Sequence, residues 1–197
     1  TSFPVAMSTW TQPLTWTMSK LDGITSASPL SSIHEMASGG AAPDVSLVEM
    51  LIGWRAGCLG ETCAVALILG GIYLVVRKVI SPTIPLTYIG TVAVIMLIAG
   101  KGDFRFVAYE LLGGGLMLGA IFMATDYTTS PITPKGKIIF GIGCGLITSI
   151  IRIFGNLPEG VSYSIIIMNI LVPLIENVTL PKPFGTPKKE KKEAEAK

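Results

Sequence analysis

The chain has 197 residues, of which 50% are hydrophobic and only 14% are charged, and its formal net charge is +2. Soluble domains carry about 25% charged residues, so this composition excludes a soluble enzyme, a disordered chain and a basic nucleic-acid-binding protein. The charge is also unevenly placed, because eight of the 28 acidic and basic residues lie in the last ten positions.

Residues 1–44 are rich in Ser, Thr, Pro and Gly, which predicts a loop outside the membrane. Residues 45–60 begin with the apolar segment VSLVEMLIGW, which is too short to cross a bilayer and predicts a half helix, either surface-lying or re-entrant. The Gly-rich stretch from Gly53 to Glu61 then leads into a helix, whose first amides carry partial positive charge. Two interpretations stay open: a site for an anionic or polar ligand, or a loop in which Glu61 simply favours a helix start.

Residues 61–180 contain five long apolar stretches separated by short, polar, turn-like joints. A helix of about 20 residues spans a hydrocarbon layer of about 30 Å, and apolar runs of this length are too long for strands. The pattern predicts an all-α integral membrane protein with about five transmembrane helices, in addition to the half helix. The stretches are Glu61–Val79, Pro85–Gly100, Phe106–Thr125, Ile138–Phe154 and Val161–Val178, of which Pro85–Gly100 is the shortest.

Residues 181–197 form a charged tail, and the distribution of Lys and Arg predicts its side of the membrane. Five spans place the N-terminal region and the tail on opposite sides. The tail and the loops on its side of the membrane carry ten basic residues. The loops on the other side carry five, and Arg152 is one of these five. Because cytoplasmic loops carry the excess of Lys and Arg, we expect the tail in the cytoplasm and residues 1–44 outside it. Without the tail lysines the two sides are equal at five each.

Several glycines stand at spacings that matter in a membrane helix. Gly115 and Gly119 are four residues apart, as are Gly141 and Gly145, and Gly113–Gly115 form a run. Small residues at this spacing let helix backbones approach closely. A loop that cradles a nucleotide would need a preceding strand, and none is predicted, so we expect close helix packing.

Acidic residues within or at the ends of the predicted spans are candidates for function. An ionisable group inside the bilayer is costly to bury and marks a functional site by default, and Glu110 lies about one turn inside its span. Asp126, Glu159 and Glu176 lie at span ends, where a solvated boundary charge is the expected state. His34 has no second ligand at metal spacing, so no metal site is predicted.

The segment at residues 20–30 holds the sharpest chemical pattern, an Asp followed by small hydroxyl residues and a proline. Taken alone, this pattern is common in loops. It resembles the flavin-attachment motif of membrane subunits of ion-pumping redox complexes, in which a transferase joins FMN through its phosphate to an acceptor hydroxyl. Asp22 matches the Asp of the motif, Thr25 its first hydroxyl residue, Ala27 its alanine and Ser28 the acceptor. Ser26 stands where glycine is typical and the usual acceptor is Thr, so Thr25 is kept as an alternative attachment point.

Further segments extend the resemblance over most of the chain, roughly from Trp10 to Leu180. They are similar to the D subunit of the Rnf complex and, less closely, to the B subunit of the sodium-pumping NADH:quinone reductase, in the NqrB/RnfD family. Members have a roughly ten-helix fold, so the chain looks like the C-terminal half of one. The segments are Glu110–Gly115, Phe122–Asp126, Thr129–Pro131, Pro134–Lys137, Ile151–Gly155, Pro158–Gly160 and Met168–Leu174.

The resemblance implies a membrane flavoprotein subunit of an ion-translocating ferredoxin:NAD oxidoreductase, which is not catalytically complete alone. Covalent FMN on Ser28, held by a phosphoester, would relay electrons coupled to Na⁺ or H⁺ transport, and a non-covalent flavin at a subunit interface stays open. Glu110 and Asp126 are the candidates for ion coupling. The implied partners are other Rnf subunits, an extracytoplasmic flavin transferase and membrane lipid, in the cytoplasmic membrane of a bacterium or archaeon, and no nucleic acid.

Three alternative functions stay open. The first is half of a solute channel or transporter, since broken helices and small-residue packing suit that class. The second is a membrane anchor without a redox role, and the third is the equivalent subunit of a sodium-pumping NADH:quinone reductase. Flavin fluorescence of the denatured protein on a gel distinguishes a covalent flavoprotein from a channel or an anchor.

Overall fold

The computed structural model describes residues 33, 46–53, 60–155 and 159–180, and every regular element within these ranges is a helix. The predicted all-α fold is therefore confirmed for this part of the chain. The flavin-attachment motif at residues 22–28 and the tail at residues 181–197 lie outside the described residues. The helices are α3 (Leu47–Ile52), α4 (Ala64–Val76), α5 (Thr83–Ala99), α6 (Phe104–Leu112), α7 (Leu116–Leu118), the π-helix η2 (Gly119–Met123), α8 (Pro134–Phe154) and α9 (Val161–Thr179).

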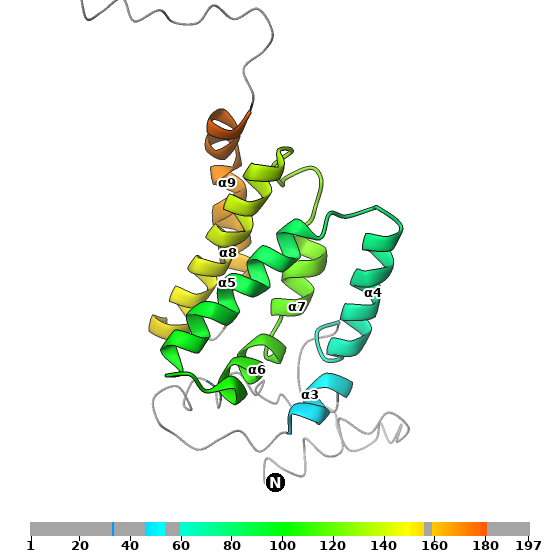
Figure 1. Ribbon diagram of the computed structural model, residues 1–197, viewed down its shortest axis with the longest axis vertical. Coiled ribbons are helices and arrows are strands. Elements are labelled where there is room, and N and C mark those ends of the chain that lie inside the picture. The colour runs from blue at the N-terminus through cyan, green and yellow to red at the C-terminus, as the bar shows by residue number, and fades with distance from the viewer. Residues whose placement is uncertain (1–32, 34–45, 54–59, 156–158, 181–197) are drawn as a thin grey trace, which may run out of the picture.

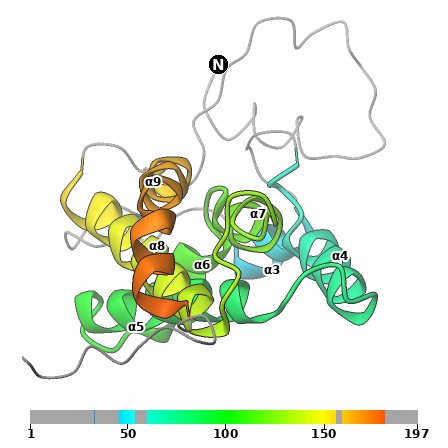
Figure 2. The same cartoon turned by 90° about the horizontal axis from the view of Figure 1, so that it is seen from above.

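The helices form a bundle in which successive long elements run in alternating directions. The loop between α4 and α5, the loop between η2 and α8, and the end of α9 lie at the upper end in Figure 1, whereas α3 and α6 lie at the lower end. Seen from above, α5, α8 and α9 are grouped on one side, α4 lies on the other, and α7 lies between them (Figure 2). The end of α4 and the start of α8 therefore lie at the same end of the bundle. We name it the basic end, because it carries Arg77 and Lys78 after α4 and Lys135 and Lys137 in α8.

The short helix predicted within residues 45–60 is confirmed as α3. Ser46 begins it with a capping box: its Oγ accepts from the Glu49 amide at 3.2 Å, and Glu49 Oε2 accepts from the Ser46 amide at 2.9 Å. Gly53 ends the helix with φ at 99°, and a Cβ there would lie 3.1 Å from Cys63 Cα. The helix therefore turns back directly onto the segment that leads into α4.

All five predicted apolar stretches contain helices, but their lengths differ. By length and composition, α8 and α9 can each cross a membrane, and α6 with α7 and η2 makes a third span if the bent pair counts as one. The apolar helices α4 and α5 are shorter, with 13 and 17 residues. The described residues thus contain two or three candidate spans, and the count of five stays a prediction.

Glycines of α8 let α5 approach closely, as the spacing of Gly141 and Gly145 predicts. A Cβ on Gly145 would lie 2.6 Å from Thr91 Cβ and 3.0 Å from the Tyr88 carbonyl oxygen, and a Cβ on Gly141 would overlap Thr87. In lipid, where burial from water contributes little, close packing of helix backbones is one of the attractions that hold helices together. The contact between α5 and α8 is the most extensive in the described bundle.

Three buried hydroxyls connect α5, α8 and α9. Tyr88 Oη lies 2.6 Å from Thr148 Oγ1 and 2.9 Å from Ser164 Oγ. Thr148 donates to Ser164 Oγ at 2.7 Å, and Ser164 donates to the Val161 carbonyl at 2.7 Å. With the Thr148 and Ser164 protons used in this way, Tyr88 acts as a donor, and each hydroxyl finds a partner inside the apolar core. The cluster fixes the register of the three helices.

Candidate functional site

The third predicted span is interrupted at Gly113–Gly115. Helix α6 ends at Leu112, α7 begins at Leu116, and the two segments are bent by 68°. Gly114 has φ at 63°, a left-handed conformation that glycine adopts without the strain of a side chain. The expectation that this glycine run serves helix packing is therefore wrong, because the run breaks the helix. The break leaves carbonyls at the end of α6 and amides at the start of α7 without helical partners.

Arg152 of α8 binds the carbonyl groups at the end of α6. Its Nη1 donates to the Glu110 carbonyl at 2.6 Å and to Glu110 Oε2 at 2.9 Å, and its Nη2 donates to the Gly113 carbonyl at 3.3 Å. Both members of the ion pair are buried, with 3% of Arg152 and 4% of Glu110 exposed. A cation at a helix C-terminus is favourable because the last carbonyls carry partial negative charge.

Two carboxylates approach the other side of the break. The Gly115 amide donates to Glu159 Oε1 at 2.8 Å. A Cβ on Gly115 would lie 3.0 Å from that oxygen and 3.1 Å from Glu61 Oε2, so the absence of a side chain lets both carboxylates come close. Glu159 is half-buried here, which corrects the expectation of a solvated boundary charge. Glu61 is buried and precedes α4 by three residues, so it does more than begin a helix.

The break gathers one cation and three carboxylates, from helices α8 and α6 and from the segments that precede α4 and α9. If all four ionise, the formal charges of Arg152, Glu110, Glu61 and Glu159 sum to −2. Irregular backbone at membrane depth persists where it is buried in protein or lines a watery cavity, and ionisable residues there mark candidate pathways for ions or protons. Within the described ranges, no group of three His, Cys, Asp or Glu side chains is placed to hold a metal ion.

The π-helix η2 follows the break directly. Its hydrogen bonds skip one residue more than those of an α-helix, as in the bond from the Ala124 amide to the Gly119 carbonyl at 2.7 Å. A Cβ on Gly119 would overlap Val161 of α9, so the predicted close packing holds at this glycine. Single-turn π-helices are frequent at functional sites.

Asp126, the second ion-coupling candidate, lies at the opposite end of the bent element from Glu110, because Glu110 is in α6 and Asp126 follows η2. It lies in the exposed loop after η2, at the upper end in Figure 1, while α6 lies at the lower end. The carboxylate accepts from the hydroxyl and the amide of Thr128, and from the Thr129 hydroxyl. These bonds, the Thr128 hydroxyl bond first, hold the pKa of Asp126 below its usual value.

Arg152 is a site residue that is absent from the sequence-based candidates. From the sequence, Arg152 is counted among the basic residues of a loop, whereas in the structure its side chain is buried and forms an ion pair with Glu110. The available signal was its position inside the predicted Ile138–Phe154 span, since an intramembrane cation requires a partner. Without Arg152, the count of basic residues becomes ten on the tail's side and four on the other.

The residues proposed for flavin attachment, Asp22, Thr25, Ala27 and Ser28, lie outside the described residues. The nearest described residue is Ile33, five positions after Ser28. Its side chain is fully buried in the hydrophobic core. Ile33 is therefore part of the hydrophobic core of the helical bundle.

Comparisons with known proteins agree with the sequence resemblance. The model of the NQR2, RnfD, RnfE family matches residues 1–185. The chain is 46% identical over 175 residues to the D subunit of the Na⁺-translocating ferredoxin:NAD⁺ oxidoreductase complex of Acetobacterium woodii, which covers 89% of this chain and 53% of that protein. It is 42% identical over 196 residues to the D subunit of the proton-translocating ferredoxin:NAD⁺ oxidoreductase complex of Clostridium ljungdahlii, which covers 94% of this chain and 57% of that protein.

A more distant relative is the D subunit of the ion-translocating oxidoreductase complex of Stutzerimonas stutzeri, at 35% identity over 210 residues. That match covers 93% of this chain and 59% of the relative. The chain thus spans a little over half the length of the relatives it matches. The region that the family model matches includes the broken element and both residues of the buried ion pair.

Proposed function

We propose, from the premise that the chain belongs to the NQR2, RnfD, RnfE family, that it is a membrane subunit of an ion-translocating ferredoxin:NAD oxidoreductase complex. The observation that carries this proposal is the family match over residues 1–185, together with two relatives at 46% and 42% identity that are named as D subunits of such complexes. The apolar helices support a place in the membrane. The other subunits of the complex complete the electron pathway.

The proposed cofactor is FMN joined to the Ser28 hydroxyl through a phosphoester, with Thr25 as the alternative acceptor. The support is the motif from Asp22 to Ser28, which has Asp, hydroxyl and alanine at matching positions. Ile33, five positions further along the chain, is buried in the hydrophobic core. The flavin would supply the electron chemistry, while the ester keeps it attached at every redox state.

The broken element is proposed to couple electron transfer to ion movement. Glu110 is the buried carboxylate at this break, and Arg152 balances its charge while also binding the freed carbonyls. In a site of low dielectric, one added charge changes the energy of every neighbouring ion strongly. Protonation of Glu110 or arrival of a cation would weaken its attraction for Arg152. Asp126, a half-buried carboxylate in the loop after η2, is the second candidate.

The flavin proposal is tested with the complete complex, expressed together with the flavin transferase. After denaturation and electrophoresis, the wild-type subunit should give a fluorescent band under ultraviolet light. Ser28→Ala should abolish the band and Thr25→Ala should leave it. If the fluorescent band is lost in Thr25→Ala and kept in Ser28→Ala, the acceptor is Thr25. A dark wild-type band would remove the covalent flavin from the proposal, and the mass of the peptide that contains Ser28 provides an independent check.

The second candidate function is half of a solute channel or transporter, and the observation that favours it is the break at Gly113–Gly115. Discontinuous helices with charged residues at the break are a feature of transporters. Ion flux into sealed vesicles separates the two functions. A channel or transporter moves ions without ferredoxin and NAD, whereas the redox subunit moves them only when the complex receives electrons.

A further inference from the structure

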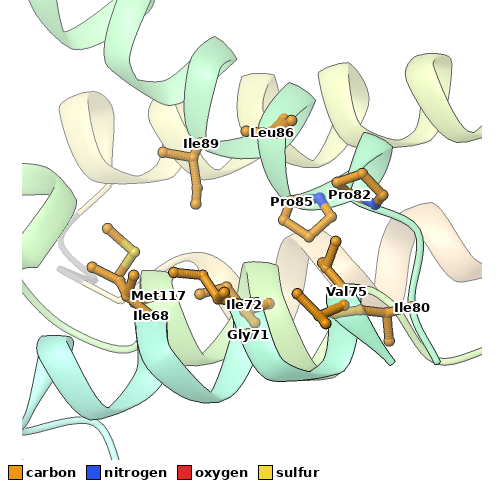
Figure 3. A pocket seen from close by; sticks show the side chains of 12 residues that line it. Ile68, Gly71, Ile72, Val75, Ile80, Pro82, Pro85, Leu86, Ile89 and Met117 are labelled. Carbon is orange, nitrogen blue, oxygen red and sulfur yellow. The ribbon is translucent and has the colours of Figure 1, made fainter. Parts of the chain in front are cut away.

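An apolar groove runs between α4 and α5 on the outside of the bundle. Its volume is about 340 Å³, and its walls are almost wholly apolar. Figure 3 shows Ile68, Ile72 and Val75 of α4 lying opposite Pro85 and Ile89 of α5. The floor comes from α7 and η2. The rims are open to the surroundings, since 54% of Ile72 and 68% of Leu86 are exposed.

The size of the groove suits a hydrocarbon chain. The α4 wall extends from Ile68 to Val76, which is about 12 Å at a rise of 1.5 Å per residue. An apolar cavity of about 150 Å³ holds one benzene molecule, so 340 Å³ has room for about a dozen carbon atoms. In a bilayer, an open apolar groove of this kind is filled by lipid tails unless a protein helix covers it.

One end of the groove carries basic side chains. Arg77 and Lys78 follow Val76, the last α4 residue of the wall, and both are exposed. Lys137 of α8 reaches the same loop, where its Nζ donates to Ser81 Oγ at 3.3 Å. Within the described part of the chain, none of the three cations forms an ion pair with a carboxylate. Lys137 also lies in the first turn of α8, where the helix dipole disfavours a cation, so an anion beside it would be stabilising.

We propose that this groove binds an anionic phospholipid. One acyl chain lies between α4 and α5, and the phosphate lies against Arg77, Lys78 and Lys137. The apolar wall recognises the tail and the basic end recognises the head group, which distinguishes this lipid from a zwitterionic one of the same chain length. The inference depends on a membrane location and not on the redox function, because no flavin is involved.

Native mass spectrometry of the detergent-solubilised complex tests the site, with phosphatidylglycerol and phosphatidylcholine of identical acyl chains as probes. The wild-type protein should bind phosphatidylglycerol more tightly. The double variant R77Q/K78Q should lose about fivefold in this affinity for each charge removed, and it should bind phosphatidylcholine as before. The matched control is K101Q/R105Q, which removes two exposed charges at the other end of the bundle. Lys78 and Lys101 also share a left-handed backbone conformation, with φ of 58° and 52°, so a change of side chain meets the same backbone in both variants.

The tail contact is tested by Ile72→Trp, which fills the groove and should lower the affinity for both lipids. A photoreactive side chain at position 72 should form its cross-link to phospholipid in the intact complex. Equal losses in the two charge variants, or unchanged affinity in R77Q/K78Q, would overturn the proposed head-group contact. A cross-link from position 72 to polypeptide would show that a protein helix covers the groove, and the lipid proposal would then fail. The flavin band serves as a separate readout of the proposed redox function.

Discussion

Arg152 Nη1 lies 2.9 Å from Glu110 Oε2 and 2.6 Å from the Glu110 carbonyl oxygen, so one guanidinium binds both the side chain and the backbone of the same residue. The two residues are 42 positions apart and belong to α8 and α6. Through this contact, the cation that balances a buried carboxylate also supplies donors to the end of a broken helix. Arg152 therefore stabilises both the irregular backbone at the break and the buried carboxylate of Glu110.

Loss of this cation should be strongly destabilising. Arg152→Met leaves the Glu110 carboxylate buried without its partner, and we expect a loss of about 3–5 kcal/mol in the free energy of unfolding. The double variant E110L/R152M should recover part of this loss, because neither member of the pair is then left buried without the other. Denaturation in detergent of the two single variants and the double variant measures the coupling. Independent, additive losses would contradict the role of the pair.

A side chain at Gly115 should be destabilising. In Gly115→Ala the added Cβ meets carboxylate oxygens at 3.0 and 3.1 Å, and we expect a loss of about 1–3 kcal/mol from overpacking. Gly90→Ala in α5 is the matched control, because nothing lies within 4 Å of its Cβ. Alanine is the better helix former, so the control should gain about 0.5–1 kcal/mol. Equal thermal stability of the two variants would argue against a tight approach of Glu61 and Glu159.

Glu110→Gln separates ion coupling from flavin attachment. The amide keeps a hydrogen-bond acceptor for Arg152 but removes the negative charge, so electron-driven uptake of Na⁺ or H⁺ into vesicles should be lost. The fluorescent band of the denatured subunit should remain, because Ser28 is unchanged. Asp126→Asn is the companion variant, and its effect should be smaller because that carboxylate is only half-buried, whereas Glu110 is buried. Full ion uptake in Glu110→Gln would remove Glu110 from the coupling proposal.

The pKa of Asp126 should depend on Thr128. The Thr128 hydroxyl is the main cause of the lowered pKa, so Thr128→Val should raise the pKa toward its usual value. A lowered pKa in the folded state means that Asp126 stabilises the fold above its unfolded pKa, and this contribution is lost as the pH falls through the folded pKa. Carbon-13 NMR titration of the Asp126 carboxyl measures the shift. Thr129→Val is the control and should move the pKa less, since its bond is the weakest of the contributing bonds.

Tyr88→Phe removes one hydroxyl from the buried cluster of α5, α8 and α9. Ser164 and Thr148 keep their mutual bond, so the expected loss is about 0.6 kcal/mol and at most about 1.7 kcal/mol, the range found for hydrogen bonds between membrane helices. Tyr73→Phe is the control, because 63% of Tyr73 is exposed, and its unfolding free energy should be unchanged. A larger loss at Tyr73 than at Tyr88 would contradict the proposed register role.

Local sequence patterns were enough to predict the helical class, the positions of the five apolar stretches and the short helix within residues 45–60. These features depend on the length of apolar runs and on the residues that begin or end a helix. The family also followed from the amino-acid sequence: the resemblance depends on segments such as Glu110–Gly115 and Ile151–Gly155, and the family model matches residues 1–185.

The packing of the helices was needed to show that Gly113–Gly115 breaks a span and that Arg152 binds Glu110. A glycine run is compatible with close helix packing and with a left-handed turn, and the contacts around Gly114 and Gly115 select the turn. The partner of Arg152 was hidden because helices in a membrane are apolar on most sides, so no polar stripe marks the face that meets a neighbour. Which faces meet is fixed by the packing of the whole bundle, and that packing brings a cation from one helix to the carbonyls that a break in another helix leaves open.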